Sequence, residues 1–302
     1  MKSFRKTASV FSVLAVALSL VFNSQRVQGN TNGPAANVAG VLLGPCGSAA
    51  AQGPTGSNDD YSNASIDGGV AVAPGRLTNG AATVVFKNTV ENAGSGDDAF
   101  IISAPSIPTG FVVEVSSDFG EHYIKLDPWT SSFTLPVAYR ASVTFLVRIT
   151  VPAGLKALTA FDTVIRASST IDPAVMNETI DRIYTGFIRI ESALKLVNAT
   201  RPEEIANAVP GSEVEFEITY TNISSAQGSG NSLLTARNIV ISENGNAPPN
   251  NWGLTTDHIV GASDNQGGYI IGDREGSTSL TDIVTSLEAG QAGIFKFRRR
   301  VK

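Results

Sequence analysis

Residues 209–222, VPGSEVEFEITYTN, decide the fold class, because apolar and polar side chains alternate through them without a break. The apolar positions are Val214, Phe216, Ile218 and Tyr220, and glutamates or a threonine stand between them. A repeat of two residues is typical of a β-strand with one buried face. Such a strand needs a second sheet layer to cover its apolar face.

The same pattern occurs at residues 72–94, VAPGRLTNGAATVVFKNTVENAG, where a Pro-Gly turn precedes a face formed by Val84, Phe86 and Val90. Turn signals recur about every 10 to 15 residues along the chain. The sequence therefore predicts an all-β protein built of two tandem immunoglobulin-like β-sandwich domains. The expected strands are 83–91, 99–104, 111–116, 122–125, 132–136, 142–151, 161–168 and 179–187, then 188–198, 212–222, 235–242, 259–262, 268–272, 281–286 and 293–301.

The length of 302 residues suits two domains, since domains cluster at about 100 to 150 residues. We expect a signal peptide at residues 1–29 and a flexible segment rich in Gly, Ala, Asn and Pro at residues 30–65. The first β-sandwich domain is then expected at residues 66–187 and the second at residues 188–302. No linker rich in Pro or Gly separates them, so the two domains should be closely coupled.

The N-terminus has the pattern of a secretory signal: Lys2, Arg5 and Lys6 precede an apolar run at residues 10–22, and small residues suited to cleavage follow at residues 27–29. The alternative is a retained membrane anchor, but the run is shorter than the roughly 20 residues that span a bilayer. We therefore expect a secreted protein, extracellular or in the cell envelope, with no transmembrane anchor in the mature chain.

Charge and cysteine content limit the possible partners and cross-links of the chain. Cleavage after residue 29 would leave 18 basic against 27 acidic residues, and such an acidic balance disfavours nucleic acid as a partner. Cys46 is the only cysteine, so no disulfide can form within the chain. Lipidation and pairing with another chain are the alternatives to an incidental thiol at this position.

Catalytic motifs are missing from the sequence. The two histidines, His122 and His258, stand in no metal-ligand spacing, and no G-x-S-x-G elbow, P-loop or dinucleotide fingerprint occurs. A pair of carboxylates for glycoside hydrolysis stays open, because the required separation is spatial. We expect no enzyme.

Two kinds of binding site are candidates. Asp59 with Asp60, and Asp97 with Asp98, offer the oxygens that Ca²⁺ prefers, although acidic turns are common without a metal. We therefore expect no cofactor, and calcium is the alternative. Exposed tryptophans can stack on sugars, and the two tryptophans of the chain both follow a proline-containing turn. The sugar-stacking candidates are Trp129 and Trp252, and the alternative is that each folds back over the end of a sandwich.

Residues 293–301 alternate so that Phe295, Phe297 and Val301 face inward. Arg299 then falls on the apolar side, which predicts that this strand bends, bulges or lies at a sheet edge. An open edge there could accept a strand from a neighbouring molecule.

Three stretches of the second predicted domain, VPGSEVEFEITYTN, NIVISENG and LEAGQAGIFKFRRRVK, resemble the bacterial surface repeat named domain of unknown function 11. The first domain, with TVVFKNTVENAG, FLVRITVPAG and DTVIRASST, is similar to sandwich linkers found beside carbohydrate-active domains. The long insertion before Trp252 departs from the repeat's usual pattern. The resemblance implies a sandwich fold and carries no catalytic residues.

That resemblance implies a non-catalytic structural or adhesive protein, secreted or at the cell surface. Its partners would be other surface proteins or copies of itself, and glycans are a further class. The alternatives are a carbohydrate- or calcium-binding surface module and, third, an enzyme or enzyme inhibitor.

Overall fold

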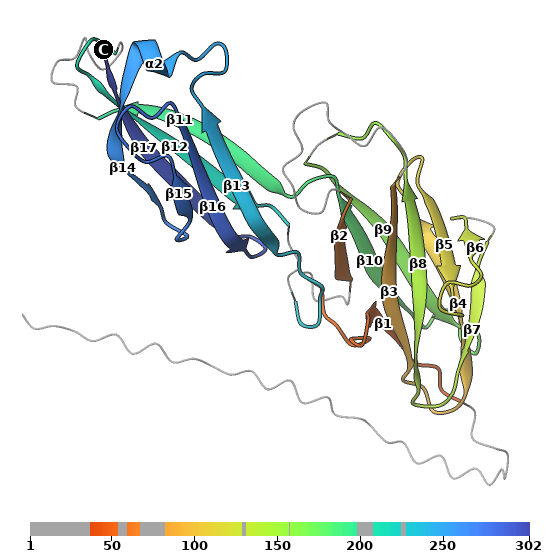
Figure 1. The fold of residues 1–302 in the computed structure, drawn as a ribbon. Coiled ribbons are helices and arrows are strands. Elements are labelled where there is room, and N and C mark those ends of the chain that lie inside the picture. Colours follow the sequence, from red (N-terminus) through yellow and green to blue (C-terminus); the bar gives the residue numbers. More distant parts are fainter. Residues whose placement is uncertain are drawn as a thin grey trace, which may run out of the picture. The chain divides into compact units, whose positions relative to one another are not determined.

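In the computed structural model, the alternating residues after Pro210-Gly211 form strand β12, Glu213–Asn222. Val214, Ile218 and Tyr220 are buried on one of its faces, as the alternation predicts, and Phe216 on the same face is half-buried. The structure describes residues 37–53, 59–66, 82–128, 131–156, 158–197, 208–224 and 228–302. Regular structure in them is almost entirely strand, as Figure 1 shows, so the all-β prediction is confirmed.

Residues 41–184 form two five-stranded sheets, which we call the first sandwich. One sheet has the order β1-β3-β8-β5-β6 and the other β2-β10-β9-β4-β7. The strands of the first sheet are β1 Val41–Pro45, β3 Ala82–Asn92, β8 Ser142–Val151, β5 Val112–Ser116 and β6 Ile124–Leu126. The strands of the second are β2 Asp60–Ser65, β10 Met176–Tyr184, β9 Ala160–Ser169, β4 Asp98–Ser106 and β7 Phe133–Val137.

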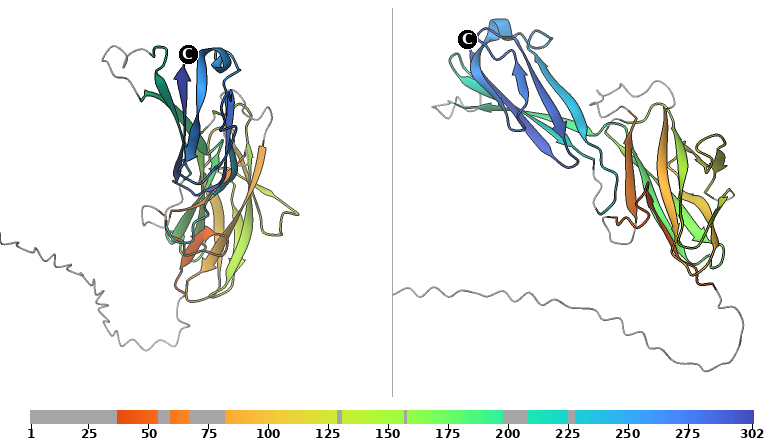
Figure 2. Two further views of the ribbon diagram at one scale, coloured as in Figure 1. Left: turned by 60° about the vertical axis from the view of Figure 1, so that its left-hand side comes forward. Right: turned by 60° about the horizontal axis from the view of Figure 1, so that its bottom comes forward.

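Residues 188–301 form a four-stranded and a three-stranded sheet, which we call the second sandwich. The orders are β11-β12-β17-β14 and β13-β16-β15. The strands besides β12 are β11 Ile188–Leu196, β17 Ala292–Val301, β14 Thr256–Asp264, β13 Ala236–Asn244, β16 Ser279–Leu287 and β15 Tyr269–Ile271. The short helix α2, Trp252–Thr255, lies beside the C-terminus at one end of these strands in every view of Figures 1 and 2.

Each sandwich has its own hydrophobic core. The core of the first includes Phe100, Phe145 and Ile165, and that of the second includes Tyr220, Phe295 and Phe297. The predicted boundary after residue 187 does not coincide with the border between the cores, because Tyr184 and Phe187 pack into the second core. Residues 37–302 also cluster as one compact unit, so the division into two domains stays a prediction.

The predicted flexible segment at residues 30–65 contains two strands in its described part, and its residues 30–36 and 54–58 lie outside the described residues. Strand β1 pairs antiparallel with β3, and β2 pairs parallel with β10. Glycine here marks close packing of backbone: a Cβ on Gly40 would stand 2.7 Å from the carbonyl carbon of Ala93, and one on Gly44 would stand 2.3 Å from the carbonyl oxygen of Ser48. The small residues thus let the chain lie against the sandwich.

The prediction that the C-terminal strand bends, bulges or lies at a sheet edge is wrong. Strand β17 lies between β12 and β14, and its pairing with β12 runs without a register shift. Its pairing with β14 does shift register, but the extra residues are on β14, between Ile259 and Ser263. The outward residues of β17 form three ion pairs across the strands, Lys296–Glu217 at 2.7 Å, Arg298–Glu215 at 2.8 Å and Arg300–Glu213 at 2.8 Å. An irregularity of β17 therefore does not explain why the Arg299 side chain faces inward.

Residues 1–29, the expected signal peptide, lie outside the described residues. Among those that the structure describes, no helix is long and apolar enough to cross a membrane.

Candidate functional site

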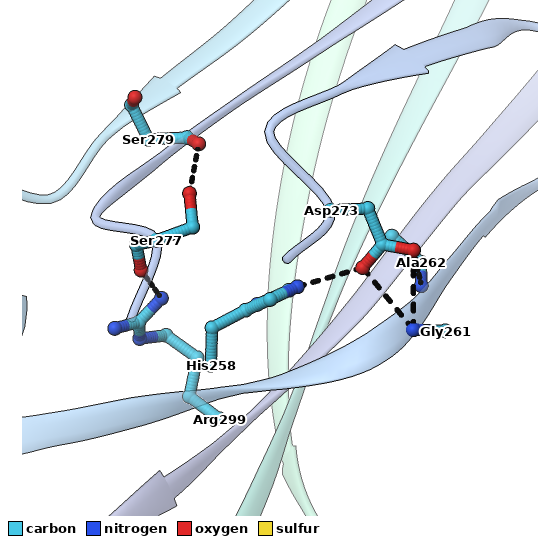
Figure 3. Close-up of polar contacts among 7 residues, drawn as sticks. All are labelled: His258, Gly261, Ala262, Asp273, Ser277, Ser279 and Arg299. Atoms are coloured by element: carbon cyan, nitrogen blue, oxygen red, sulfur yellow. Dashed lines mark hydrogen bonds and ion pairs between the residues drawn. The ribbon is translucent and has the colours of Figure 1, made fainter. Parts of the chain in front are cut away.

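The end of the second sandwich gathers the polar groups drawn in Figure 3, and Arg299 is the largest of them. Its side chain is 1% exposed because it shares the inner face of β17 with Phe295 and Phe297. The guanidinium donates to Thr256 Oγ1 at 2.6 Å and to the carbonyl oxygen of Ser277 at 2.8 Å. Burial lowers the pKa of Arg299 to about 10. Arg299 therefore ties β17 to β14 and to the turn after β15.

Trp252 covers Arg299 from the side of helix α2. The guanidinium carbon lies 4.3 Å from the centre of the indole ring, a cation–π contact. The same ring packs against Phe216 and Phe297, with centroids 5.4 and 5.6 Å away. Trp252 is only 5% exposed, so it has no free face for a sugar ring and folds back over the sandwich end. The other sugar-stacking candidate, Trp129, lies outside the described residues.

His258 and Asp273 form a second polar contact at this end, with Nε2 and Oδ1 2.7 Å apart (Figure 3). Strand β14 shifts register between Ile259 and Ser263, and Gly261 there has φ 125°, so the amides of Gly261 and Ala262 turn toward Asp273. Burial raises the pKa of Asp273, but the hydrogen bonds from His258 and from these two amides outweigh it and lower the pKa below its ordinary value.

A histidine–aspartate pair is part of a hydrolytic triad, which also needs a nucleophile at the other ring nitrogen. Nδ1 of His258 is buried and has no hydrogen-bond partner among the residues that the structure describes. The nearby Ser277 hydroxyl instead donates to the carbonyl oxygen of Ser279 at 2.7 Å (Figure 3). The arrangement thus holds a bulged strand to a turn and offers no assembled acyl-transfer site.

A groove of about 410 Å³ lies beside Asp273. It is lined by both apolar and polar side chains, including Tyr269, Ile271, Arg274 and Thr281. Tyr269 and Ile271 on β15 are exposed, so the groove opens at the edge strand of the three-stranded sheet.

The calcium candidates Asp97 and Asp98 are engaged in protein contacts. Asp98 is buried and accepts hydrogen bonds from Ser169 Oγ at 2.5 Å and Thr170 Oγ1 at 3.0 Å. Asp97 accepts the amide of Tyr139 at 2.8 Å. These contacts tie the turn before β4 to neighbouring loops.

The other calcium candidates, Asp59 and Asp60, do not form a solvated turn. Asp60 begins strand β2 and is fully buried, whereas Asp59 precedes the strand and is half-buried. The Thr179 hydroxyl donates to Asp60 Oδ1. Thr179 lies on strand β10, 119 residues from Asp60 in the chain, so no local spacing in the sequence could reveal this contact.

An acidic group that the sequence did not single out surrounds His122. His122 Nδ1 lies 2.6 Å from Asp118 Oδ2, and Glu121 is close to both. The hydrogen bonds from Ser116 and from His122 lower the pKa of Asp118. The group stands at the surface, where acidic side chains are common without a metal, and it carries no assignment.

Strand β11 is an edge strand of the second sandwich. It ends the four-stranded sheet, and among the described strands it pairs only with β12 (Figure 1). Ile190 and Leu194 stand opposite Tyr220 and Phe216, so they lie on the core side of the sheet. They are nevertheless 45% and 64% exposed, because the facing sheet has three strands and leaves β11 uncovered.

No protein-family model and no curated protein matches the chain. Among solved structures, the C-terminal domain of the AgI/II polypeptide BspA from Streptococcus agalactiae is similar, with 7% identity, coverage of 83% of this chain and 90% of that chain, and a TM-score of 0.38. The secreted serine protease VesC from Vibrio cholerae has 11% identity, coverage of 79% and 45%, and a TM-score of 0.24. Likeness this low carries no argument about function, and the kinship with domain of unknown function 11 stays a resemblance.

Proposed function

We propose that the chain is a non-catalytic structural or adhesive protein of the cell exterior, which assembles by pairing its β11 edge with β11 of a second copy. The observation that carries the proposal is an edge strand whose residues 189–195 are exposed on both faces. An edge strand offers unpaired amides and carbonyls to another strand, and apolar side chains beside it add burial. Adhesion to other surface proteins would use the same edge.

The side chains of β11 complement themselves in an antiparallel, two-fold arrangement. With Ala193 on the axis, Glu191 of one copy stands opposite Lys195 of the other, and Ile190 stands opposite Leu196. Both matches occur twice, once on each side of the axis, as symmetry requires. Opposite charges and apolar pairs across strands are stabilising. Within one copy, the salt-bridge partner of Glu191 among the described residues is Arg189, at 3.7 Å and exposed to solvent.

Export is the first expected result. The mature chain should begin near Asn30 and occur in the medium or the envelope, because a positive start and a short apolar run favour cleavage by a signal peptidase. Cell fractionation followed by N-terminal sequencing measures both. Recovery of a chain that begins at Met1 from the cytoplasm would refute the location.

Self-association is the second expected result. Leu194→Asp should raise the dissociation constant of the dimer at least tenfold, about 1.4 kcal/mol, because it places a charge in the apolar part of the paired edge. Analytical ultracentrifugation over a concentration series measures this constant. Val240→Asp is the matched control, since Val240 is an exposed apolar residue on β13, an edge strand of the other sheet. Equal weakening by both substitutions would place the contact elsewhere.

Charge exchange sharpens the same test. Glu191→Lys and Lys195→Glu should each weaken association, because each places like charges opposite one another in the register described above. The double exchange restores opposite charges and should recover most of the affinity. A wild-type chain that stays monomeric at millimolar concentration would refute the β11 pairing. It would not test whether the protein is exported, which cell fractionation measures separately.

A further inference from the structure

Two carboxylates point into the first sandwich from one of its sheets. Asp181 on β10 lies between Thr179 and Ile183 on the buried face of that strand, and Ile183 belongs to the core. Asp60 on the neighbouring edge strand β2 stands opposite Thr179 in the parallel register. Both aspartates are 0% exposed. Their charges therefore face the interior, where solvent cannot screen them.

An amide meets them from the opposite sheet. Asn88 lies on β3 between Phe86 and Val90, two residues of the core, so its side chain also points inward. Its Nδ2 donates to Asp181 Oδ2 at 3.0 Å. This hydrogen bond crosses the sandwich interior and joins the two sheets.

Ser62, the next inward residue of β2, is buried and stands opposite Asp181 in the same register. Four buried oxygens of these residues have no hydrogen-bond partner among the described residues. They are Asp60 Oδ2, Ser62 Oγ, Asn88 Oδ1 and Asp181 Oδ1. A buried polar atom without a partner costs about 1–3 kcal/mol, so four together are a large penalty for one domain. Burial raises the pKa of Asp60 to about 7, and burial with the nearby Asp60 charge raises the pKa of Asp181 to about 8. A proton or a bound cation must therefore neutralise the negative charge of the two aspartates.

We propose that Asp60, Ser62, Asn88 and Asp181 hold a divalent cation of the calcium type between the two sheets of the first sandwich. Two carboxylates balance a charge of +2, and the amide and hydroxyl oxygens are the neutral ligands that such hard cations accept. The remaining positions of the coordination shell fall to backbone carbonyls or water. The cation would link strands β2 and β10 of one sheet to strand β3 of the other sheet.

A second buried carboxylate pair shows why this cluster, and not buried acid in general, suggests a metal. Asp282 in the second sandwich is 0% exposed and contacts Asp264, whose charge contributes to raising the pKa of Asp282 to about 6 after the larger effect of burial. Asp264 already accepts the Tyr220 hydroxyl at 2.6 Å and two amides. Both carboxylate oxygens of Asp282 also lack a hydrogen-bond partner among the described residues, but no amide oxygen is directed at this pair among the described contacts.

The experiment uses the full chain and Ca²⁺ itself as the probe. After dialysis against a chelator, added CaCl₂ should raise the melting temperature by roughly 5 °C or more, and isothermal titration should give a dissociation constant on the order of 10⁻⁴ M or tighter. Asp181→Asn and Asn88→Ala should each weaken Ca²⁺ binding at least tenfold. Asp282→Asn is the matched control, a buried aspartate of the other sandwich, and should leave the binding constant unchanged.

Other outcomes overturn the proposal. If the wild-type chain binds neither Ca²⁺, Mg²⁺ nor Mn²⁺ in titration, and none of them shifts its melting temperature, a proton neutralises the cluster instead. Asp181→Asn would then raise stability at pH 8. Binding that survives in Asn88→Ala and Asp181→Asn but is lost in Asp282→Asn would move the site to the second sandwich. If Asp181→Asn fails to fold, the wild-type titration and Asn88→Ala decide alone.

Discussion

Phe145→Ala should lower the free energy of unfolding by about 3–5 kcal/mol, the range for emptying a buried aromatic site. Phe145 lies on the inner face of β8, is 1% exposed and belongs to the core of the first sandwich. Strand β8 is the centre of its sheet, with β3 on one side and β5 on the other. Neighbouring strands therefore restrict collapse around the cavity. Denaturant unfolding followed by fluorescence or circular dichroism measures the loss.

Lys87→Ala is the control for this substitution. Lys87 is exposed on the neighbouring strand β3, and a surface change of this kind should alter stability by less than about 0.5 kcal/mol. Similar losses for Lys87→Ala and Phe145→Ala would contradict the inward and outward assignment of the two strands. Phe216→Ala should cost less than Phe145→Ala, because Phe216 is only half-buried although it stacks on Phe297 at 4.8 Å.

Alternation predicted the strands well because it reports directly on burial. Each strand range expected from residue 83 onward overlaps an observed strand, from β3 to β17. Phe216 shows the limit of the rule: the pattern gives the face of a side chain but not how far the opposite sheet extends over it. The uncovered inner face of β11 has the same cause, since alternation in one strand says nothing about the width of the other sheet.

Strands β1 and β2 could not be predicted from the same rule. The β1 sequence VLLGP and the β2 sequence DYSNAS do not alternate as apolar and polar residues, and glycines around them suggested flexibility. Asp60 and Ser62 are buried residues of β2, so the inner face of this strand is polar, whereas the alternation rule detects only strands with an apolar inner face. The partners Asn88 and Asp181 lie 93 residues apart in the chain.

Strand β1 determines how deletion of residues 30–53 should affect the first sandwich. A flexible segment could be deleted without effect, but residues 30–53 contain β1, whose Val41 and Leu43 belong to the core of the first sandwich. Their removal should therefore destabilise that sandwich. Arg299 is a similar case at the other end of the chain. The alternation placed it correctly on the inner face, and only the structure shows that Trp252 and Thr256 make that position acceptable.

Removal of residues 292–302 should prevent the second sandwich from folding. Strand β17 lies between β12 and β14, so its loss separates β14 from the sheet and removes the ion pairs to β12. The deletion also takes Phe295, Phe297 and Arg299 out of the interior. The core of the first sandwich contains no residue of β17, so it should stay folded. Circular dichroism and limited proteolysis of the truncated chain measure both effects.

Deletion of Lys302 alone is the matched control, because it leaves β17 whole. It removes an exposed ion pair to Asp257 at 3.2 Å, the bond from Lys302 Nζ to the Gly253 carbonyl at 2.6 Å and the bond from the Lys302 amide to the Thr255 carbonyl, which together should have a small effect. The longer deletion should instead make residues 188–291 sensitive to protease while residues 37–184 resist it. A truncated chain that melts cooperatively at the wild-type temperature would mean that β17 is dispensable, which a central strand carrying two buried phenylalanines does not allow.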